Sequence, residues 1–174
     1  MQRGGDMANL EARMRTVDEH IACENRHDLE GLLRSFGASA RYDDEPWNER
    51  HEGPDAVRTY YETILRAMPD LHIDVRRRYA ADDTVILEVV LSGTHLGPWR
   101  GMPATGRRVS FPLCAFFTFE DDDRLAGERI YYDRATILRQ IGVFREPDTT
   151  AGRVELTLSH PVTLLKALGR SLRA

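Results

Sequence analysis

The chain from Thr84 to Asp133 holds three β-type runs, TVILEVVLS (84–92), RVSFPLCAFFTFE (108–120) and LAGERIYYD (125–133). In the first run apolar side chains recur at every second position, at Val85, Leu87, Val89 and Leu91. This period of two is typical of a strand with one buried face. An earlier alternating run at 71–76 and acidic turns at 81–83 and 121–123 complete the pattern. Together these runs predict a four-stranded antiparallel meander.

The chain before residue 71 has the three-and-four spacing of amphipathic helices. Apolar residues at 10, 14, 17 and 21 predict a first helix capped by Asn9. A second, shorter turn follows from the cap Asp28 to Gly37, and a third helix runs from Pro54 to Pro69. Between them we expect a short strand at 39–43 and a polar loop at 44–53. Helices followed by antiparallel strands predict an α+β fold.

The length of 174 residues fits one domain with some chain to spare. We expect a disordered start at 1–8, one domain at 9–144 and a C-terminal extension at 145–174. The extension holds five basic and three acidic residues, so the net charge of −4 divides into +2 there and −6 before it. Within the extension, 153–158 reads as a β-like run and a helix begins near Pro161.

Composition excludes several classes of function. The net charge of −4 gives no electrostatic reason to expect nucleic acid. No apolar run approaches the roughly 20 residues that span a bilayer, and no signal peptide is recognisable. Cys23 and Cys114 show no metal-ligand spacing. A single lysine, Lys166, beside 23 arginines is typical of a GC-rich bacterial genome. We therefore expect a cytoplasmic bacterial protein with no metal, nucleic acid or membrane partner.

Two segments resemble the SnoaL-like polyketide cyclases of the nuclear-transport-factor-2-like superfamily. They are GTHLGPWRGMPATGRRVSFP (93–112) and IYYDRATILRQIG (130–142), and the resemblance covers roughly 10–144. It implies a cone-shaped, bent antiparallel sheet around a pocket that the N-terminal helices close. It also implies an ester cyclase-type enzyme without cofactor, which closes a hydrophobic polyketide-like ligand by an intramolecular aldol step, and we expect a homodimer.

Two residues are the candidate catalytic groups. The resemblance gives Asp133 the acid/base role, and an inward Asp133 after the apolar strand 130–132 would have a pKa raised by desolvation. Aspartate at this place could instead cap the helical turn that begins at Arg134. His95 shares the apolar face of 85–91, so we expect it to donate to a ketone or enolate oxygen. Alternatively, it hydrogen-bonds the backbone of its own loop.

Four residues are expected to bind substrate. Tyr131 projects to the same face as Asp133, at a position where the cyclases often carry histidine. Trp47, Trp99 and Met102 fall in loops around the expected pocket mouth, where they would contact flat rings or cover the core.

Two other functions remain open at this point. In an isomerase or hydratase of the same fold, the acid would come from the end of the first strand, at Asp43 or Asp44. A non-catalytic binding or dimeric accessory protein would use the pocket without any acid/base group.

Overall fold

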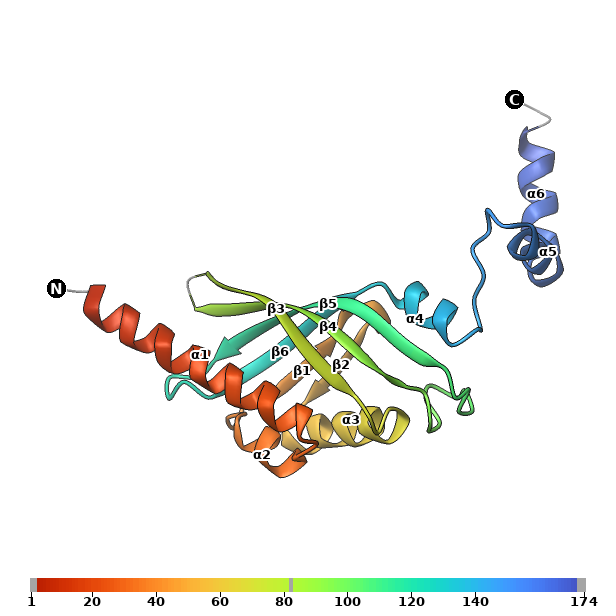
Figure 1. The fold of residues 1–174 in the computed structure, drawn as a ribbon. Helices are drawn as coiled ribbons and strands as arrows, with labels where there is room; N and C mark the ends of the chain where they lie inside the picture. The colour runs from red at the N-terminus through yellow and green to blue at the C-terminus, as the bar shows by residue number, and fades with distance from the viewer. Residues whose placement is uncertain (1–2, 82, 172–174) are drawn as a thin grey trace.

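The computed structural model describes residues 3–81 and 83–171 (Figure 1). The helices are α1 (Arg3–Asn25), α2 (Leu29–Arg34), α3 (Pro54–Ala67), α4 (Arg134–Gln140), α5 (Thr150–Ser159) and α6 (Pro161–Ser171), with a 3-10 turn η1 (Glu45–Trp47). The strands are β1 (Arg41–Asp44), β2 (Glu49–Glu52), β3 (His72–Ala81), β4 (Thr84–Thr94), β5 (Arg108–Phe119) and β6 (Leu125–Tyr132).

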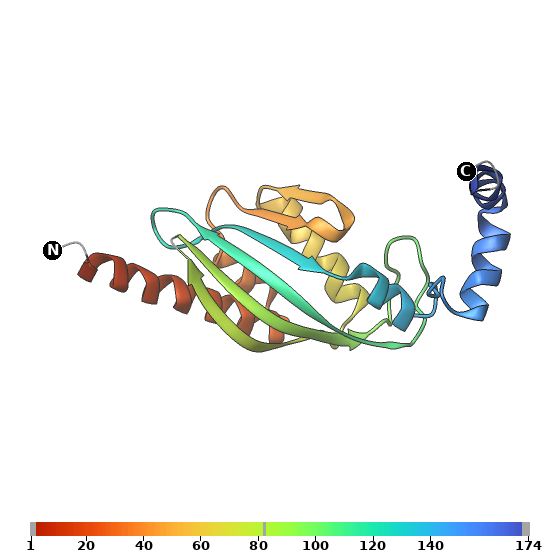
Figure 2. The ribbon, with the colours of Figure 1, turned by 90° about the horizontal axis from the view of Figure 1, so that it is seen from above.

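All six strands form one curled, unclosed sheet in the order β2-β1-β6-β5-β4-β3. Strands β3 to β6 pair antiparallel in succession, as the period-two runs predict, and β1 lies parallel to β6. Figures 1 and 2 show α2 and α3 on one side of this sheet, with α1 crossing beside them. The predicted α+β fold is confirmed.

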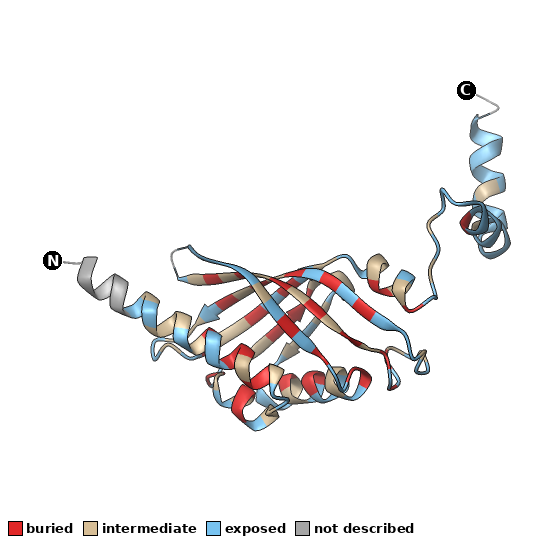
Figure 3. Cartoon of the chain, viewed as in Figure 1, coloured by how far each residue is buried: buried red, intermediate tan, exposed pale blue. Residues whose placement is uncertain are grey.

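The hydrophobic core lies between the helices and the inner face of the sheet (Figure 3). Leu87 of β4, Phe117 of β5 and Val57 of α3 are fully buried there. Asp28 caps α2 as predicted, because its carboxylate accepts the Gly31 N–H at 2.8 Å. The apolar face of the alternating strands thus packs against the apolar face of the helices, and both faces are buried.

Three sequence predictions differ from the structure. The expected loop 44–53 contains η1 and β2, and β2 pairs with β1 as a polar edge strand. Helix α1 begins at Arg3 rather than after Asn9, while residues 1 and 2 of the expected disordered start lie outside the described chain. The expected β-like run 153–158 is helical and belongs to α5, whose cap Thr149 accepts the Gly152 N–H. The predicted helix at Pro161 is confirmed as α6.

Helices α5 and α6 project away from the sheet and its covering helices (Figures 1 and 2). Exposed apolar side chains lie along both helices: Val154, Leu158, Val162, Leu165 and Leu168. Within residues 3–81 and 83–171, no helix is both long enough and apolar enough to cross a membrane.

Candidate functional site

A cavity opens between the inner face of the sheet, α3 and the end of α1. The space between its lining atoms totals about 600 Å³, including the part that is open to solvent. Most of the lining is aliphatic or aromatic, from β4, β5, β6, α3 and α4. Its polar groups are Glu24, Tyr42, Tyr60, Tyr61, His95 and Tyr132. An apolar space with a few converging polar groups is the usual form of a small-molecule site.

The loop after β4 places His95 and Trp99 in the cavity wall. Both side chains are buried, as sequence alternation predicts for His95. The N–H groups of Leu96 and Gly97 both donate to the Ala67 carbonyl at the end of α3, at 2.9 and 3.1 Å. A Cβ at position 97 would lie 2.1 Å from the Arg66 carbonyl oxygen. Only glycine therefore permits this close approach, which anchors the loop beside the cavity.

The hydrogen bonds of His95 fix which ring nitrogen carries the proton. Its Nδ1 lies 3.4 Å from the Thr105 backbone nitrogen and 3.1 Å from the Thr105 hydroxyl. A backbone N–H can only donate, so Nδ1 is the acceptor and the neutral ring carries its hydrogen on Nε2. This Nε2 is buried without a hydrogen-bond partner in the described residues. His95 thus lines the cavity and holds one N–H donor that no described residue uses.

Glu24 is the only carboxyl group in the described cavity lining. It lies in the last turns of α1, with 6 % of its surface exposed. Burial, followed by the nearby charge of Glu128, raises the pKa of Glu24 well above its ordinary value. No hydrogen bond to this carboxyl is present among the described side chains; the nearest histidine nitrogen, Nε2 of His20, lies 3.9 Å away. Glu24 therefore combines access to the cavity with a proton affinity suited to acid/base chemistry.

Asp44 lies just behind the cavity wall, at the end of β1, and is 1 % exposed. Tyr132 donates its hydroxyl to both Asp44 oxygens at 3.0 and 3.1 Å, and the Tyr60 hydroxyl donates at 3.3 Å. Burial raises the pKa of Asp44, while the Arg100 guanidinium, 3.0 Å away, opposes the rise. Each tyrosine gives its single proton to Asp44, so the hydroxyl oxygen of each keeps only acceptor capacity for a further partner.

Arg100 joins this network to the loops around the cavity. It also donates to Glu49 of β2. Its guanidinium lies 4.1 Å from the centre of the Trp47 ring and 5.3 Å from that of Trp99, within the range of cation–π attraction. The two tryptophan rings meet edge to face at 5.6 Å. One cation thus ties two aromatic loop residues and two carboxylates together.

The prediction that Asp133 points into the cavity is wrong. Asp133 is exposed and caps α4, accepting from the N–H groups of Ala135 and Thr136 and from the Thr136 hydroxyl. The Thr136 hydroxyl, together with these N–H groups, lowers the pKa of Asp133 instead of raising it. The helix-cap alternative describes this residue.

The prediction that Tyr131 lines the pocket is also wrong, because its neighbour Tyr132 lines the cavity and Tyr131 does not. Tyr131 is 44 % exposed on the outer face of the sheet, opposite Cys114. Strand alternation puts Tyr132 on the face of Ile130 and Glu128, both of which are buried. Tyr131 and Asp133 do share a face, as predicted, but it is the outer one.

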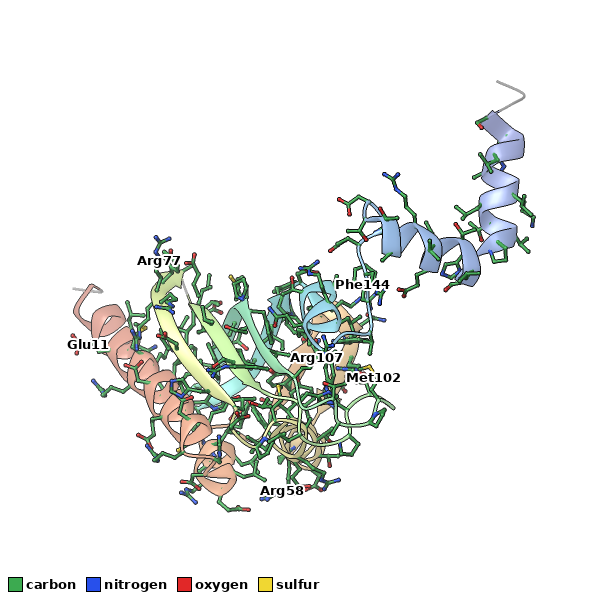
Figure 4. The ribbon with its side chains drawn as sticks, turned by 45° about the vertical axis from the view of Figure 1, so that its right-hand side comes forward. Glu11, Arg58, Arg77, Met102, Arg107 and Phe144 are labelled. Atoms are coloured by element: carbon green, nitrogen blue, oxygen red, sulfur yellow. The ribbon has the colours of Figure 1, made fainter. Side chains whose placement is uncertain are left out.

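The remaining predicted residues do not line the cavity. Trp47 packs on Arg100, and its indole nitrogen is buried without a partner among the described residues. Met102 pairs with Trp99 through two backbone hydrogen bonds, in the loop between β4 and β5, and is labelled in Figure 4. Asp43 faces outward to Arg41 and Arg129. In residues 3–81 and 83–171 no cluster of His, Cys, Asp or Glu side chains is arranged to hold a metal ion.

Sequence reasoning overlooked the acid and histidine on α1. The sequence alone did not single out either His20 or Glu24, because charged and polar residue types usually face solvent. Both extend the stripe of Val17 and Ile21 at helical spacing, and both are buried with it. That spacing could have predicted their burial, because polar residues in line with the apolar stripe of a helix face the core with it.

Comparison with known proteins agrees with this architecture. The sequence profile of the SnoaL-like polyketide cyclases matches residues 14–141. AclR of Streptomyces galilaeus, whose proposed activity is hydroxylation, is 27 % identical with a TM-score of 0.67, over 76 % of this chain and 97 % of AclR. IdmH of Streptomyces antibioticus, a proposed polyketide cyclase, is 21 % identical with a TM-score of 0.64, over 75 % of this chain and 99 % of IdmH.

A protein of Catenulispora acidiphila with a ketosteroid-isomerase-like fold, in complex with trimethylamine, is 19 % identical. Its TM-score is 0.62, over 78 % of this chain and 96 % of that protein. Among curated proteins, none matches the sequence. The family profile spans most of the chain, including every strand and the whole cavity lining. The chain therefore belongs to the SnoaL-like polyketide cyclase family.

Proposed function

We propose that this protein cyclises a hydrophobic, polyketide-like carbonyl compound by acid/base catalysis, with Glu24 as the proton carrier and His95 as the donor to the reacting oxygen. The observation that carries the proposal is one lone carboxyl group and one unused N–H donor in the lining of the same apolar cavity. Apolar surroundings strengthen both groups, because water neither screens nor competes with them.

The reaction balances without a cofactor. The Glu24 carboxylate takes a proton from the carbon beside a carbonyl group, and the enolate oxygen accepts a hydrogen bond from His95 Nε2. The enolate carbon then forms a bond with a second carbonyl carbon of the same molecule. The protonated Glu24 returns its proton to the new alkoxide. A raised pKa makes the carboxylate of Glu24 a stronger base than an exposed glutamate.

The aromatic lining favours a ring-containing or ring-forming ligand. Tyr60 and Tyr132 supply acceptor oxygens through their bonds to Asp44, so a phenol or enol hydroxyl of the ligand would have a partner there. Trp99 supplies a flat apolar surface near His95, with ring centres 6.3 Å apart. These groups support a polyketide-like compound with alternating carbonyl and hydroxyl oxygens.

The first half of the proposed reaction can be measured on a small probe. We expect the wild-type protein to catalyse hydrogen–deuterium exchange at the carbon beside the carbonyl of 2-tetralone in D₂O, followed by proton NMR. Glu24→Gln should lower the exchange rate about 10²- to 10⁴-fold, because it removes the base. His95→Phe should lower it about 10²- to 10³-fold, because it removes the oxygen donor.

Glu30→Gln is the matched control, because Glu30 is an exposed glutamate of α2 that pairs with Arg58. It should leave exchange unchanged. Equal exchange in the wild type and Glu24→Gln would contradict the role of Glu24. Quenching of tryptophan fluorescence by 2-tetralone without any catalysed exchange would instead favour the non-catalytic binding protein.

A further inference from the structure

A buried polar cluster lies directly behind Glu24. His20 of α1 places its Nε2 3.3 Å from an oxygen of Glu128 in β6 and 3.9 Å from an oxygen of Glu24. The Tyr61 hydroxyl donates to the same Glu128 oxygen at 2.7 Å and lies 3.2 Å from His20 Nε2. His20 is completely buried, and both glutamates are 6 % exposed. One imidazole thus faces two carboxyl groups away from solvent.

The other nitrogen of His20 has a fixed role. Its Nδ1 lies 2.8 Å from the Ser35 hydroxyl oxygen. That hydroxyl gives its only hydrogen to the Leu32 carbonyl at 2.6 Å, so it can only accept from Nδ1. The neutral ring therefore carries its hydrogen on Nδ1 and turns the lone pair of Nε2 toward the glutamates.

This arrangement requires one more proton. A lone pair on Nε2 and a carboxylate oxygen 3.3 Å away repel each other unless a hydrogen lies between them or a neighbouring carboxyl group is protonated. The Tyr61 hydrogen is committed to Glu128. Among the described side chains no lysine or arginine bonds to the cluster. The proton must then be held by the imidazole and the two glutamates themselves.

We infer that His20, Glu24 and Glu128 share one exchangeable proton, and that its movement between His20 and Glu24 sets the charge of Glu24 in the cavity. When Nε2 takes the proton, an imidazolium faces the Glu128 carboxylate and Glu24 becomes the free base. When the proton returns, Glu24 is the acid. The number of protons in the cluster is the same in both states, and the transfer needs the Glu24 oxygen to approach Nε2 by about 1 Å.

Aromatic rings shield the His20 side of this cluster from bulk water. The aromatic rings of Phe36 and Phe117 lie edge-on to the His20 ring, at 5.4 and 5.7 Å between centres. The ionisable or charged groups that face Glu24 come from α1 (His20), α3 (Tyr61), β1 (Tyr42) and β6 (Glu128). Burial raises the pKa of Tyr42 and of Tyr61 well above the ordinary value, so neither tyrosine ionises in competition. His20 is thus a positioning residue that acts through Glu24, and this role rests on the proposed function.

The test is nitrogen NMR of the histidine rings in the full-length protein without ligand at about pH 7. We expect Nδ1 of His20 to keep its hydrogen in the wild type and in Glu24→Gln. In the wild type the Nε2 signal of His20 should lie between the positions of a bare and a protonated ring nitrogen, because the proton is shared with Glu24. In Glu24→Gln this partner is gone, so the Nε2 signal should move to one of these two positions.

Ser35→Ala is a milder second variant, because it removes only the acceptor of the Nδ1 hydrogen. The neutral ring should then partly carry its hydrogen on Nε2. The signal of His160, which is exposed between α5 and α6, is the internal control and should be the same in all three proteins. An identical Nε2 signal of His20 in the wild type and Glu24→Gln would overturn the shared proton, as would a neutral wild-type ring with its hydrogen on Nε2 instead of Nδ1. Because no substrate is present, this result is independent of the 2-tetralone exchange.

Discussion

A substitution at Asp133 that exchanges a single heavy atom can separate a catalytic role of this residue from a structural one. Asparagine keeps an oxygen that accepts the N–H groups at the start of α4 but cannot carry a proton in catalysis. We therefore expect Asp133→Asn to keep both the free energy of unfolding and the 2-tetralone exchange rate near wild type. Asp133→Ala should lower the free energy of unfolding by about 1 kcal/mol through loss of the cap.

Urea unfolding and exchange kinetics on the same preparations test this expectation. Glu24→Gln provides the contrast, since it should lose exchange. An Asp133→Asn protein that unfolds like the wild type yet no longer catalyses exchange would return the acid/base role to Asp133.

The candidate site could be predicted only in part at the level of single residues. His95 was predicted because it follows an uninterrupted alternation from β4, and Trp99 because it falls in a loop around the expected pocket mouth. The sequence did not predict which of Tyr131 and Tyr132 faces the cavity. The register of β6 against β5 shifts near Phe119, and the inward face of β6 holds a buried acid, Glu128. A buried acid reads as a surface residue until its partners, which are distant in sequence, are known.

At the scale of elements, the junction between α3 and the loop after β4 holds the cavity wall in place. A Cβ on residue 97 would overlap the Arg66 carbonyl, and relief would move the loop off the end of α3. We expect Gly97→Ala to weaken binding of 2-tetralone at least about tenfold, because His95 and Trp99 move with the loop, and to lower the free energy of unfolding by about 1 to 3 kcal/mol.

Fluorescence titration and urea unfolding measure the two effects. Gly169→Ala in α6 is the matched control, because a Cβ there meets nothing within 4 Å. It should leave 2-tetralone binding unchanged and should not lower the free energy of unfolding, since alanine is favoured over glycine in a helix. Wild-type binding by Gly97→Ala would show that this junction does not position the wall.

Helices and strands could be predicted where the spacing of apolar residues in the sequence matches the face that the structure buries. The strands β3 to β6 and the helices α2, α3 and α6 have one apolar face each, and their sequences show it. Strand β2 has polar residues throughout, so only its pairing with β1 reveals it. Helix α5 places Val154, Leu156 and Leu158 at alternate positions, which is a strand pattern, but no described strand pairs with this segment. Hydrogen bonds within the helix satisfy its backbone instead.

At the scale of the whole molecule, charge and apolar surface are divided between two parts. The chain up to residue 144 has a net charge of −6 and contains the whole cavity lining, whereas 145–174 has a net charge of +2. Five apolar side chains of α5 and α6 are 56–77 % exposed. A basic, apolar extension is complementary to the acidic body of a second copy, which is consistent with the predicted homodimer.

Truncation after Phe144 tests this arrangement. The cavity lining ends at Ile141, so we expect the shortened chain to keep its 2-tetralone exchange. We expect the full-length chain to be a dimer in light scattering and the truncated chain to be a monomer, because the exposed leucines no longer bury surface against a partner. Replacing Leu158, Leu165 and Leu168 with Ser in the full-length chain should have the same effect, while Lys166→Gln, which keeps the apolar face, should leave the dimer in place. A monomeric full-length chain, or a truncated chain that still dimerises, would contradict assembly through α5 and α6 and leave the outer face of the sheet around Tyr131 as the next surface to mutate.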